Sequence, residues 1–270
     1  MKASISVANY QWPMPQFMVQ GDLDPIFAAI SKIGYQGVDL FLETSEGVDA
    51  ARMKELLQRH HLEVSMLQGL LDLVRSGLNM GHPDASIRKE FLDRSSVHLK
   101  LASSLGAMVP VGFSRGNTPP GVRREDHKGW FLETVEKYHK MAHDLGVTLI
   151  LEPINRYEMN FINTVEEALE IVETLRLPNL KLLLDSFHMN IEEDSIPRAI
   201  WKAKDHIAHF HFVDSNRRVP GYGHTDMKEI FRCLKGVGYQ GFLGLEAEPK
   251  PEPLMAARFG IEYLRLLMKL

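Results

Sequence analysis

The sequence has a single cysteine, Cys233, among 270 residues, and this scarcity excludes two kinds of structure. One cysteine can form neither a disulfide framework within the chain nor a zinc site of the multi-cysteine type. Cys233 falls in a stretch of helical character (227–235), where we expect an inert core thiol. The composition, 44% hydrophobic and 24% charged, is typical of a globular protein with a sizeable core.

Long apolar runs and a strong net charge are also absent. No stretch approaches the roughly 20 consecutive apolar residues that span a bilayer. The first residues, MKASISVANYQW, lack the hydrophobic segment of a secretion signal. The net charge is only −4, so charge favours neither nucleic acid nor an anionic membrane as a partner. We therefore expect a cytoplasmic protein that binds neither nucleic acid nor membrane.

The sequence does contain a regular alternation of short apolar runs and longer amphipathic stretches. Short apolar runs bounded by loop signals predict strands that are buried on both faces. Eight strands are expected, at 5–8, 37–42, 63–68, 107–113, 148–153, 180–184, 208–213 and 241–247. Eight helices are expected after them in turn, at 22–33, 48–60, 84–105, 124–145, 165–175, 197–205, 226–235 and 252–269.

This alternation, with no linker or shift in composition, is typical of one closed (β/α)8 barrel, the TIM barrel, which we predict as a single domain over residues 1–270. A short internal repeat supports it. IGYQG (33–37) recurs as VGYQG (237–241), each time between a helix and a strand, where glycine ends the helix. The competing α/β fold is a dinucleotide-binding sheet, but no GxGxxG follows the first strand.

Four successive predicted strands end in side chains that can bind a metal ion, namely Glu152, Asp185, His211 and Glu246. Neighbouring strand ends meet in a barrel, so these side chains are expected to converge. Three carboxylates and one imidazole suit Mn²⁺, Mg²⁺ or Co²⁺ better than structural zinc. Each residue alone has an ordinary alternative, as a solvated or helix-capping carboxylate or as a core histidine. We expect His209, two residues before His211, to be such a core histidine.

A second group of polar residues follows the same strand ends. Glu158 lies beyond the fifth strand, His188 beyond the sixth and Arg217 beyond the seventh. Beside a metal ion, arginine and histidine can hold the oxygens of a hydroxylated substrate and offset the charge of an enolate. The alternative is that Arg217 pairs with Asp214 or with another nearby carboxylate.

The loop GFSRGNTPPGVRR (112–124) contains three arginines, Arg115, Arg123 and Arg124. If this loop covers the site, one of them can reach an acidic group of a substrate; the alternative is a solvated loop. No glycine-rich phosphate cradle follows the seventh or eighth strand, which disfavours a phosphorylated substrate.

Four motifs make a family resemblance visible: LEPINRYEMNFINT (151–164), LLDSFHMNIEE (183–193), HFHFVDSNRRVPGYGHTD (209–226) and GLEAEP (244–249). They resemble the D-tagatose 3-epimerase and D-allulose 3-epimerase family, in the xylose isomerase-like barrel superfamily. The resemblance implies that Glu152, Asp185, His211 and Glu246 bind one divalent ion, usually manganese. It also implies that Glu158, His188 and Arg217 hold the substrate around its carbonyl group, and that the protein is a homodimer or homotetramer.

The chain departs from this family in ways that concern the substrate. Members acting on free ketohexoses often have a tryptophan after the fourth strand, where this chain has Phe113, which we expect to contact the substrate. The segments VPVGFSRG, HPDASIRKE and FINT look closer to a divergent bacterial branch, which includes an epimerase of a keto-sugar acid. A free ketose and a keto-sugar acid therefore both remain open as substrates.

The residues and the resemblance together predict a two-base C3 epimerase. A metal ion bound to the C2 carbonyl and C3 hydroxyl oxygens would stabilise the enediolate formed by proton loss. Glu152 and Glu246 are expected to face opposite sides of the substrate, so that one removes the C3 proton and the other returns one. The alternatives are a hydroxypyruvate-type aldose–ketose isomerase, a keto-inositol dehydratase, an abasic-site endonuclease and a non-catalytic sugar-binding module.

Overall fold

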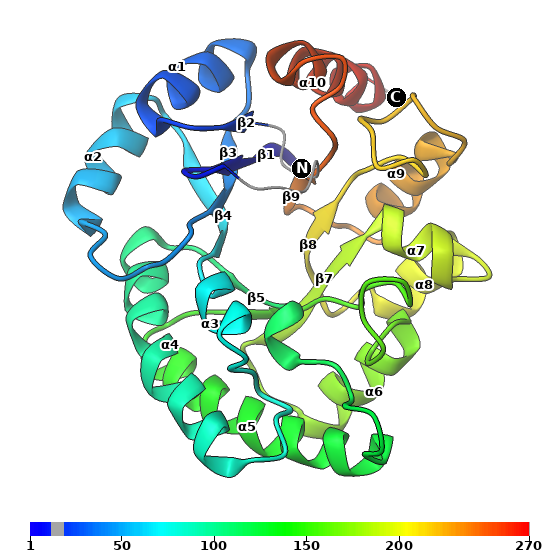
Figure 1. Cartoon of the computed structure of the whole chain (residues 1–270). Coiled ribbons are helices and arrows are strands. Elements are labelled where there is room, and N and C mark those ends of the chain that lie inside the picture. The colour runs from blue at the N-terminus through cyan, green and yellow to red at the C-terminus, as the bar shows by residue number, and fades with distance from the viewer. Residues whose placement is uncertain (12–18, 270) are drawn as a thin grey trace.

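The computed structural model describes residues 1–11 and 19–269 and shows a barrel of parallel strands surrounded by helices (Figure 1). All eight predicted strands form, as β1 (Lys2–Ala8), β3 (Gly37–Phe41), β4 (Glu63–Gln68), β5 (Val109–Val111), β6 (Leu149–Leu151), β7 (Leu180–Asp185), β8 (Ile207–His211) and β9 (Phe242–Leu245). A further short strand, β2 (Val19–Gln20), pairs with β1 outside this ring. The predicted α/β barrel is confirmed.

The strands follow one another in the order β4-β3-β1-β9-β8-β7-β6-β5, and every pair is parallel. Between β4 and β5 the contact is reduced to an isolated bridge between Met66 and Met108, so the ring is nearly closed. Because all strands run the same way, their carboxyl ends lie at one end of the barrel. The predicted ligands are therefore brought to the same end.

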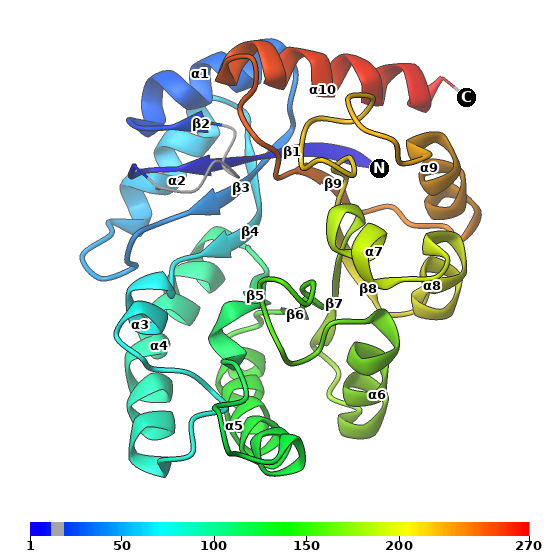
Figure 2. The same ribbon diagram turned by 45° about the vertical axis from the view of Figure 1, so that its right-hand side comes forward.

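Eight helices cover the outside of the barrel at the predicted places: α1 (Leu23–Ile33), α2 (Ala50–Arg59), α4 (Ala85–Leu105), α5 (Arg124–Asp144), α6 (Val165–Leu175), α8 (Ile196–Ala203), α9 (Met227–Gly236) and α10 (Pro253–Met268). Helices α1 and α10, the first and the last helix of the chain, lie side by side (Figure 2). The hydroxyl of Tyr35, just after α1, donates to the carbonyl of Ala257 at 2.7 Å. Among the described residues, no helix has the length and apolarity needed to cross a bilayer.

The two copies of the glycine repeat occupy equivalent places in the fold. Gly34 ends α1 with φ 114°, and Gly238 follows α9 with φ 77°. Residues with a side chain rarely adopt this left-handed conformation, so glycine is needed to turn the chain from each helix into the next strand.

Besides strand β2, three short helical elements were not predicted: helix α3 (Leu71–Arg75), the 3-10 turn η1 (Phe113–Arg115) and helix α7 (Ser186–Glu192). Each follows the carboxyl end of a strand and lies at the functional end of the barrel. Helix α7 begins where the side chain of Asp185 accepts a hydrogen bond from the N–H of Phe187. A capping contact of this kind depends on one side chain and leaves little periodicity in the sequence.

The barrel interior differs from the layer between strands and helices. The main apolar core fills that outer layer. Inside the ring, a second and much smaller apolar cluster is formed by Ala8, Phe41, Met66, Ile150 and Leu183. Buried polar side chains also point into the interior, among them Asp39, His209 and His211. The interior of the barrel therefore contains ionisable side chains as well as apolar ones.

Candidate metal and active site

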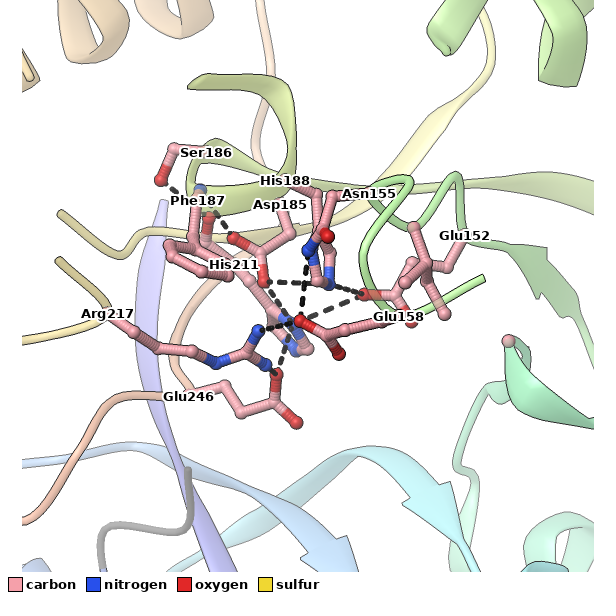
Figure 3. Close-up of polar contacts among 12 residues, drawn as sticks. Glu152, Asn155, Glu158, Asp185, Ser186, Phe187, His188, His211, Arg217 and Glu246 are labelled. Carbon is pink, nitrogen blue, oxygen red and sulfur yellow. Dashed lines mark hydrogen bonds and ion pairs between the residues drawn. The ribbon is translucent and has the colours of Figure 1, made fainter. Parts of the chain in front are cut away.

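The four residues predicted to bind a metal ion, Glu152, Asp185, His211 and Glu246, meet at one end of the barrel (Figure 3). They stand at, or one residue beyond, the carboxyl ends of the neighbouring strands β6, β7, β8 and β9. Nδ1 of His211 lies 3.9, 3.7 and 3.6 Å from one oxygen of each of the three carboxylates, in chain order. One imidazole nitrogen thus faces three carboxylates at nearly equal distances.

Several of these atoms are buried without a hydrogen-bond partner, which is costly for polar groups. Among the described residues, Oδ2 of Asp185 and both ring nitrogens of His211 have no hydrogen-bond partner, although Asp185 is fully buried and His211 is 1% exposed. Ligand atoms of Glu152, Asp185 and His211 lie within 4.8 Å of one another. A divalent cation would satisfy Oδ2 of Asp185 and Nδ1 of His211 together, so the residues present fit a metal site.

The three carboxyl groups of the site have strongly perturbed pKa values in the absence of a cation. Burial, together with the charges of Glu246 and Asp185, raises the pKa of Glu152 to about 8, against the attraction of His211. Burial also raises the pKa of Glu246, against the attraction of Arg217. Burial would raise the pKa of Asp185 too, but neighbouring imidazoles and Arg217 lower it to about 2. Crowded carboxyl groups of this kind favour a cation in place of protons.

His188 is held beside these carboxylates by Asn155, a residue to which the sequence patterns assigned no role. Nδ2 of Asn155 donates to Nδ1 of His188 at 2.7 Å and to Oε1 of Glu158 at 2.9 Å. This leaves Nε2 of His188 to carry the proton, 3.9 Å from Glu152 and 3.8 Å from Asp185. Burial lowers the pKa of His188 to about 3, so the ring is a neutral hydrogen-bond donor.

Arg217 forms ion pairs with two carboxylates of the site, Glu246 and Glu158. Its Nη2 lies 2.7 Å from Oε2 of Glu246, and its Nη1 lies 3.4 Å from Oε1 of Glu158. Its guanidinium also lies over the ring of Phe187, 4.7 Å from the centroid. The backbone of Arg217 has φ 58°, a strained conformation for a residue with a side chain, and such strain is concentrated at functional sites. Arg217 therefore pairs with carboxylates, but with Glu158 and Glu246 of the site rather than with Asp214, and its contact with a substrate stays a prediction.

A cavity opens at this end of the barrel, and all the predicted site residues except Asp185 line it. Its polar wall is formed by Glu152, Glu158, His188, His211, Arg217 and Glu246. Its other wall is mainly apolar and is formed by Phe41, Met66, Gln68, Leu71, Pro110, Gly112, Phe113 and Ile154. Phe113 lines the cavity, while its contact with a substrate stays a prediction, and the unpredicted helix α3 contributes Leu71.

The three arginines of the 112–124 loop are engaged by other groups, which disfavours the interpretation that one of them reaches an acidic group of a substrate. Arg115 is fully buried and donates to backbone carbonyls, including Glu152 O at 2.8 Å and Ile162 O at 2.9 Å. Arg123 pairs with Asp126, and Arg124 pairs with Glu167. None of the three is among the lining residues. Arg115 instead fixes the backbone that presents Glu152.

The fold agrees with what comparison with known proteins shows. The chain belongs to the xylose isomerase-like TIM barrel family, which it matches over residues 22–267.

Curated relatives in this family include epimerases of several sugars. The chain is 42% identical over 115 residues to a D-psicose 3-epimerase of Ruminiclostridium cellulolyticum, an alignment that covers 43% of this chain and 39% of the relative. It is 32% identical over 134 residues to a 3-dehydro-D-guloside 4-epimerase of Escherichia coli, covering 49% of this chain and 51% of the relative. The chain thus spans about two fifths to one half of the length of these relatives.

Solved structures show the same fold over the whole chain. An L-ribulose 3-epimerase structure superimposes with a TM-score of 0.85 at 24% identity, covering 99% of this chain and 95% of the other. At this identity the similarity concerns the fold, so the chemistry has to be argued from the site itself.

Proposed function

We propose that the protein is a metal-dependent sugar epimerase that inverts C3 of a ketose by two-base proton transfer through an enediolate. The observation that carries this proposal is the position of Glu152 and Glu246. The two carboxylates stand at the two ends of an arc of four strand ends, with Asp185 and His211 between them, and both line the same cavity (Figure 3). This arrangement supports bases on two sides of one bound substrate.

Glu152, Asp185, His211 and Glu246 would hold one divalent cation, with Mn²⁺ as the first choice and Mg²⁺ or Co²⁺ as alternatives. When bound, the cation would act as a Lewis acid that makes hydrogen next to a carbonyl group more acidic. Its positive charge would also keep both glutamates ionised and ready to accept a proton near neutral pH.

Inversion at carbon requires that the proton leaves from one face of the substrate and returns to the other. Glu152 comes from β6 and Glu246 from β9, so each can serve one face. Either residue can start the reaction, because the reverse reaction exchanges their roles. The backbone contact of Arg115 with Glu152 and the side-chain contact of Arg217 with Glu246 keep the two bases in place.

Around the substrate carbonyl, this chain offers one neutral donor and one cationic donor. His188 would donate from Nε2 to a substrate oxygen, because Asn155 occupies its other nitrogen. Arg217 and Glu158 would hold neighbouring oxygens of the substrate. The positive charge of Arg217 would stabilise the negative charge that develops on the substrate as the proton leaves. Phe113 and the apolar wall would contact the far end of the substrate.

The charges in the cavity favour an uncharged sugar over a keto-sugar acid or a sugar phosphate. Among the described residues that line the cavity, the only lysine or arginine is Arg217, which already pairs with Glu246 and Glu158. The loop arginines are committed elsewhere. A carboxylate or phosphate group on the substrate would therefore lack a positively charged partner in this part of the site.

In the test, the Mn²⁺-loaded protein is incubated in D₂O with each member of a panel of ketohexoses, ketopentoses and keto-aldonates. The paramagnetic ion is then removed, and NMR of the sugar shows where deuterium has entered. We expect deuterium at C3 of an uncharged ketose together with formation of its C3 epimer. Deuterium at C1 or C2 would indicate an aldose–ketose isomerase. Loss of water from an inositol ketone would indicate a dehydratase.

A second candidate, epimerisation at C4 of a 3-keto sugar, is favoured by the similarity to the 3-dehydro-D-guloside 4-epimerase. The same two bases would act one carbon further along the substrate, next to a carbonyl at C3. A 3-keto-glycoside therefore belongs in the panel, and deuterium at its C4 would select this reaction.

A further inference from the structure

Asp39 is a buried carboxylate that the proposed reaction does not use and that no sequence motif pointed to. It lies on β3, inside the barrel, and is fully buried. Its Oδ1 accepts hydrogen bonds from the hydroxyls of Ser4, at 3.0 Å, and Ser65. Oδ1 also lies 3.2 Å from Nε2 of His209, and Oδ2 lies 3.5 Å from Nε2 of His211.

A glycine allows Asp39 to lie this close to the two histidines. Gly244 on β9 stands between the strands that carry Asp39 and the two histidines. A Cβ atom at Gly244 would overlap Oδ2 of Asp39 and lie 2.9 Å from Nε2 of His209. Any larger residue at position 244 would therefore push the carboxylate away from the imidazoles.

The two nitrogens of His211 face different groups. Nδ1 faces the three carboxylates of the proposed metal site, and Nε2 faces Asp39. An acceptor at one ring nitrogen keeps the proton there, fixes the orientation of the ring and makes the other nitrogen a better ligand. The two serine hydroxyls fix the carboxylate of Asp39 in turn.

From this geometry we infer that Asp39 is a positioning residue, which holds the proton of His211 on Nε2 and directs Nδ1 to the divalent cation. Ser4, Ser65 and Gly244 support Asp39 in this role. His209, expected from the sequence to be a core histidine, is buried beside it and contacts the same carboxylate. The inference rests on the proposed function, because it requires that His211 binds a cation.

The same contacts are compatible with two different roles for Asp39. The carboxylate could act only in stability, as one member of a buried polar network. Alternatively Asp39, His209 and His211 could themselves hold a second cation, since their ligand atoms lie within 4.8 Å of one another. In that case Nε2 of His211 would be a ligand and would carry no proton.

The experiment is a calorimetric titration of chelator-treated protein with Mn²⁺, which does not depend on turnover. We expect one cation per chain in the wild-type protein and an affinity about 10- to 100-fold weaker in Asp39→Asn, the range found when such a partner of a ligating histidine is removed. Thermal unfolding of each variant reports whether the fold is retained.

A matched pair of serine variants tests the inference without changing any charge. Ser65 donates to Asp39. Ser6 is also buried on a barrel strand and aligned with Asp39, but its hydroxyl has no hydrogen-bond partner in the part of the chain that the structure describes. We expect Ser65→Ala to weaken Mn²⁺ binding several-fold and Ser6→Ala to leave it unchanged. This pair decides the question if Asp39→Asn does not fold.

Each result distinguishes among these roles of Asp39. Wild-type affinity in both Asp39→Asn and Ser65→Ala would overturn the inference alone and leave Asp39 with a role in stability. Two cations per chain, or a proton found on Nδ1 rather than Nε2 of His211 by ¹⁵N NMR of the Mg²⁺-loaded protein, would also overturn it. No binding of cations by the wild-type protein would overturn the proposed function, and the inference with it.

Discussion

Individual residues of the site are held by partners that come from other strands or from the loops after them. His211 lies between a carboxylate beneath it, Asp39, and three carboxylates around its other nitrogen. His188 depends on Asn155 in the same way. The side chains proposed to act on the substrate therefore have defined orientations before the substrate binds, which is what catalysis by positioned groups requires.

Replacement of Glu152 or Glu246 by glutamine is expected to lower kcat by at least about 10³-fold, because each variant lacks one of the two bases. Each variant should still exchange the C3 hydrogen of one epimer with solvent, since the remaining base can remove a proton from one face and return it there. Rate measurements and NMR in D₂O test both points.

The control for these variants is the binding of Mn²⁺, measured without substrate, which shows whether the metal site survives. Substantial epimerisation by either variant with the cation bound would contradict the two-base scheme. Exchange of both epimers at equal rates would contradict the assignment of one base to each face.

At the scale of elements, the site is built from strand ends and from the short segments that follow them. Arg115, in the turn after β5, donates to the carbonyls of Gly112, Glu152 and Phe161 and to that of Ile162. Ile162 has φ 59°, a strained conformation for a β-branched residue. One buried guanidinium thus ties the end of β5 to the end of β6 and to the loop before α6.

Replacement of Arg115 by lysine is expected to destabilise the protein by about 2 kcal/mol or more, because lysine cannot reach these carbonyls together and leaves buried acceptors without partners. A fall in kcat should accompany the loss of stability, since the backbone of Glu152 is no longer fixed. Urea unfolding and steady-state kinetics measure the two effects.

Arg123→Lys is the matched control, because Arg123 belongs to the same loop but is exposed and, among the described residues, forms its ion pair with Asp126 alone. It should leave both the unfolding midpoint and kcat as they are in the wild-type protein. Equal behaviour of the two variants would show that Arg115 does not have the structural role proposed for it.

At the scale of the whole molecule, the crowded charges of the site link stability to pH and to cation binding. In the metal-free protein the pKa of Glu152 is about 8, raised by burial from an ordinary value of 4.5. Burial would lower the pKa of His211, but contacts with Asp185 and Asp39 raise it well above 6.5. Both groups therefore add stability while protonated, and this stability is lost as pH rises through their folded-state pKa values.

The unfolding temperature of the metal-free protein is accordingly expected to fall by several degrees between pH 6.5 and 8. Histidines with lowered pKa values, such as His188, act only below this window. Saturation with Mn²⁺ should raise the unfolding temperature more at pH 8 than at pH 6.5, because fewer protons have to leave the site. An unfolding temperature of the metal-free protein that rises with pH would contradict this linkage.

The expected homodimer or homotetramer, the cytoplasmic location and the single domain over residues 1–270 stay predictions. Light scattering coupled to gel filtration would test the first of them directly. The same measurement on metal-free protein would show whether the cation affects assembly.

The sequence by itself determined the alternation of strands and helices and the identity of four side chains that meet at one end of the barrel. Both follow from local patterns: apolar runs predict strands, amphipathic stretches predict helices, and the barrel fold brings successive strand ends together. Only the tertiary structure decided which partners hold these side chains. The contacts of Arg115 with carbonyls, of Asn155 with His188 and of Asp39 with His211 join residues distant in the chain. They depend on strand register, on burial and on the space left by Gly244, none of which appears in a local pattern.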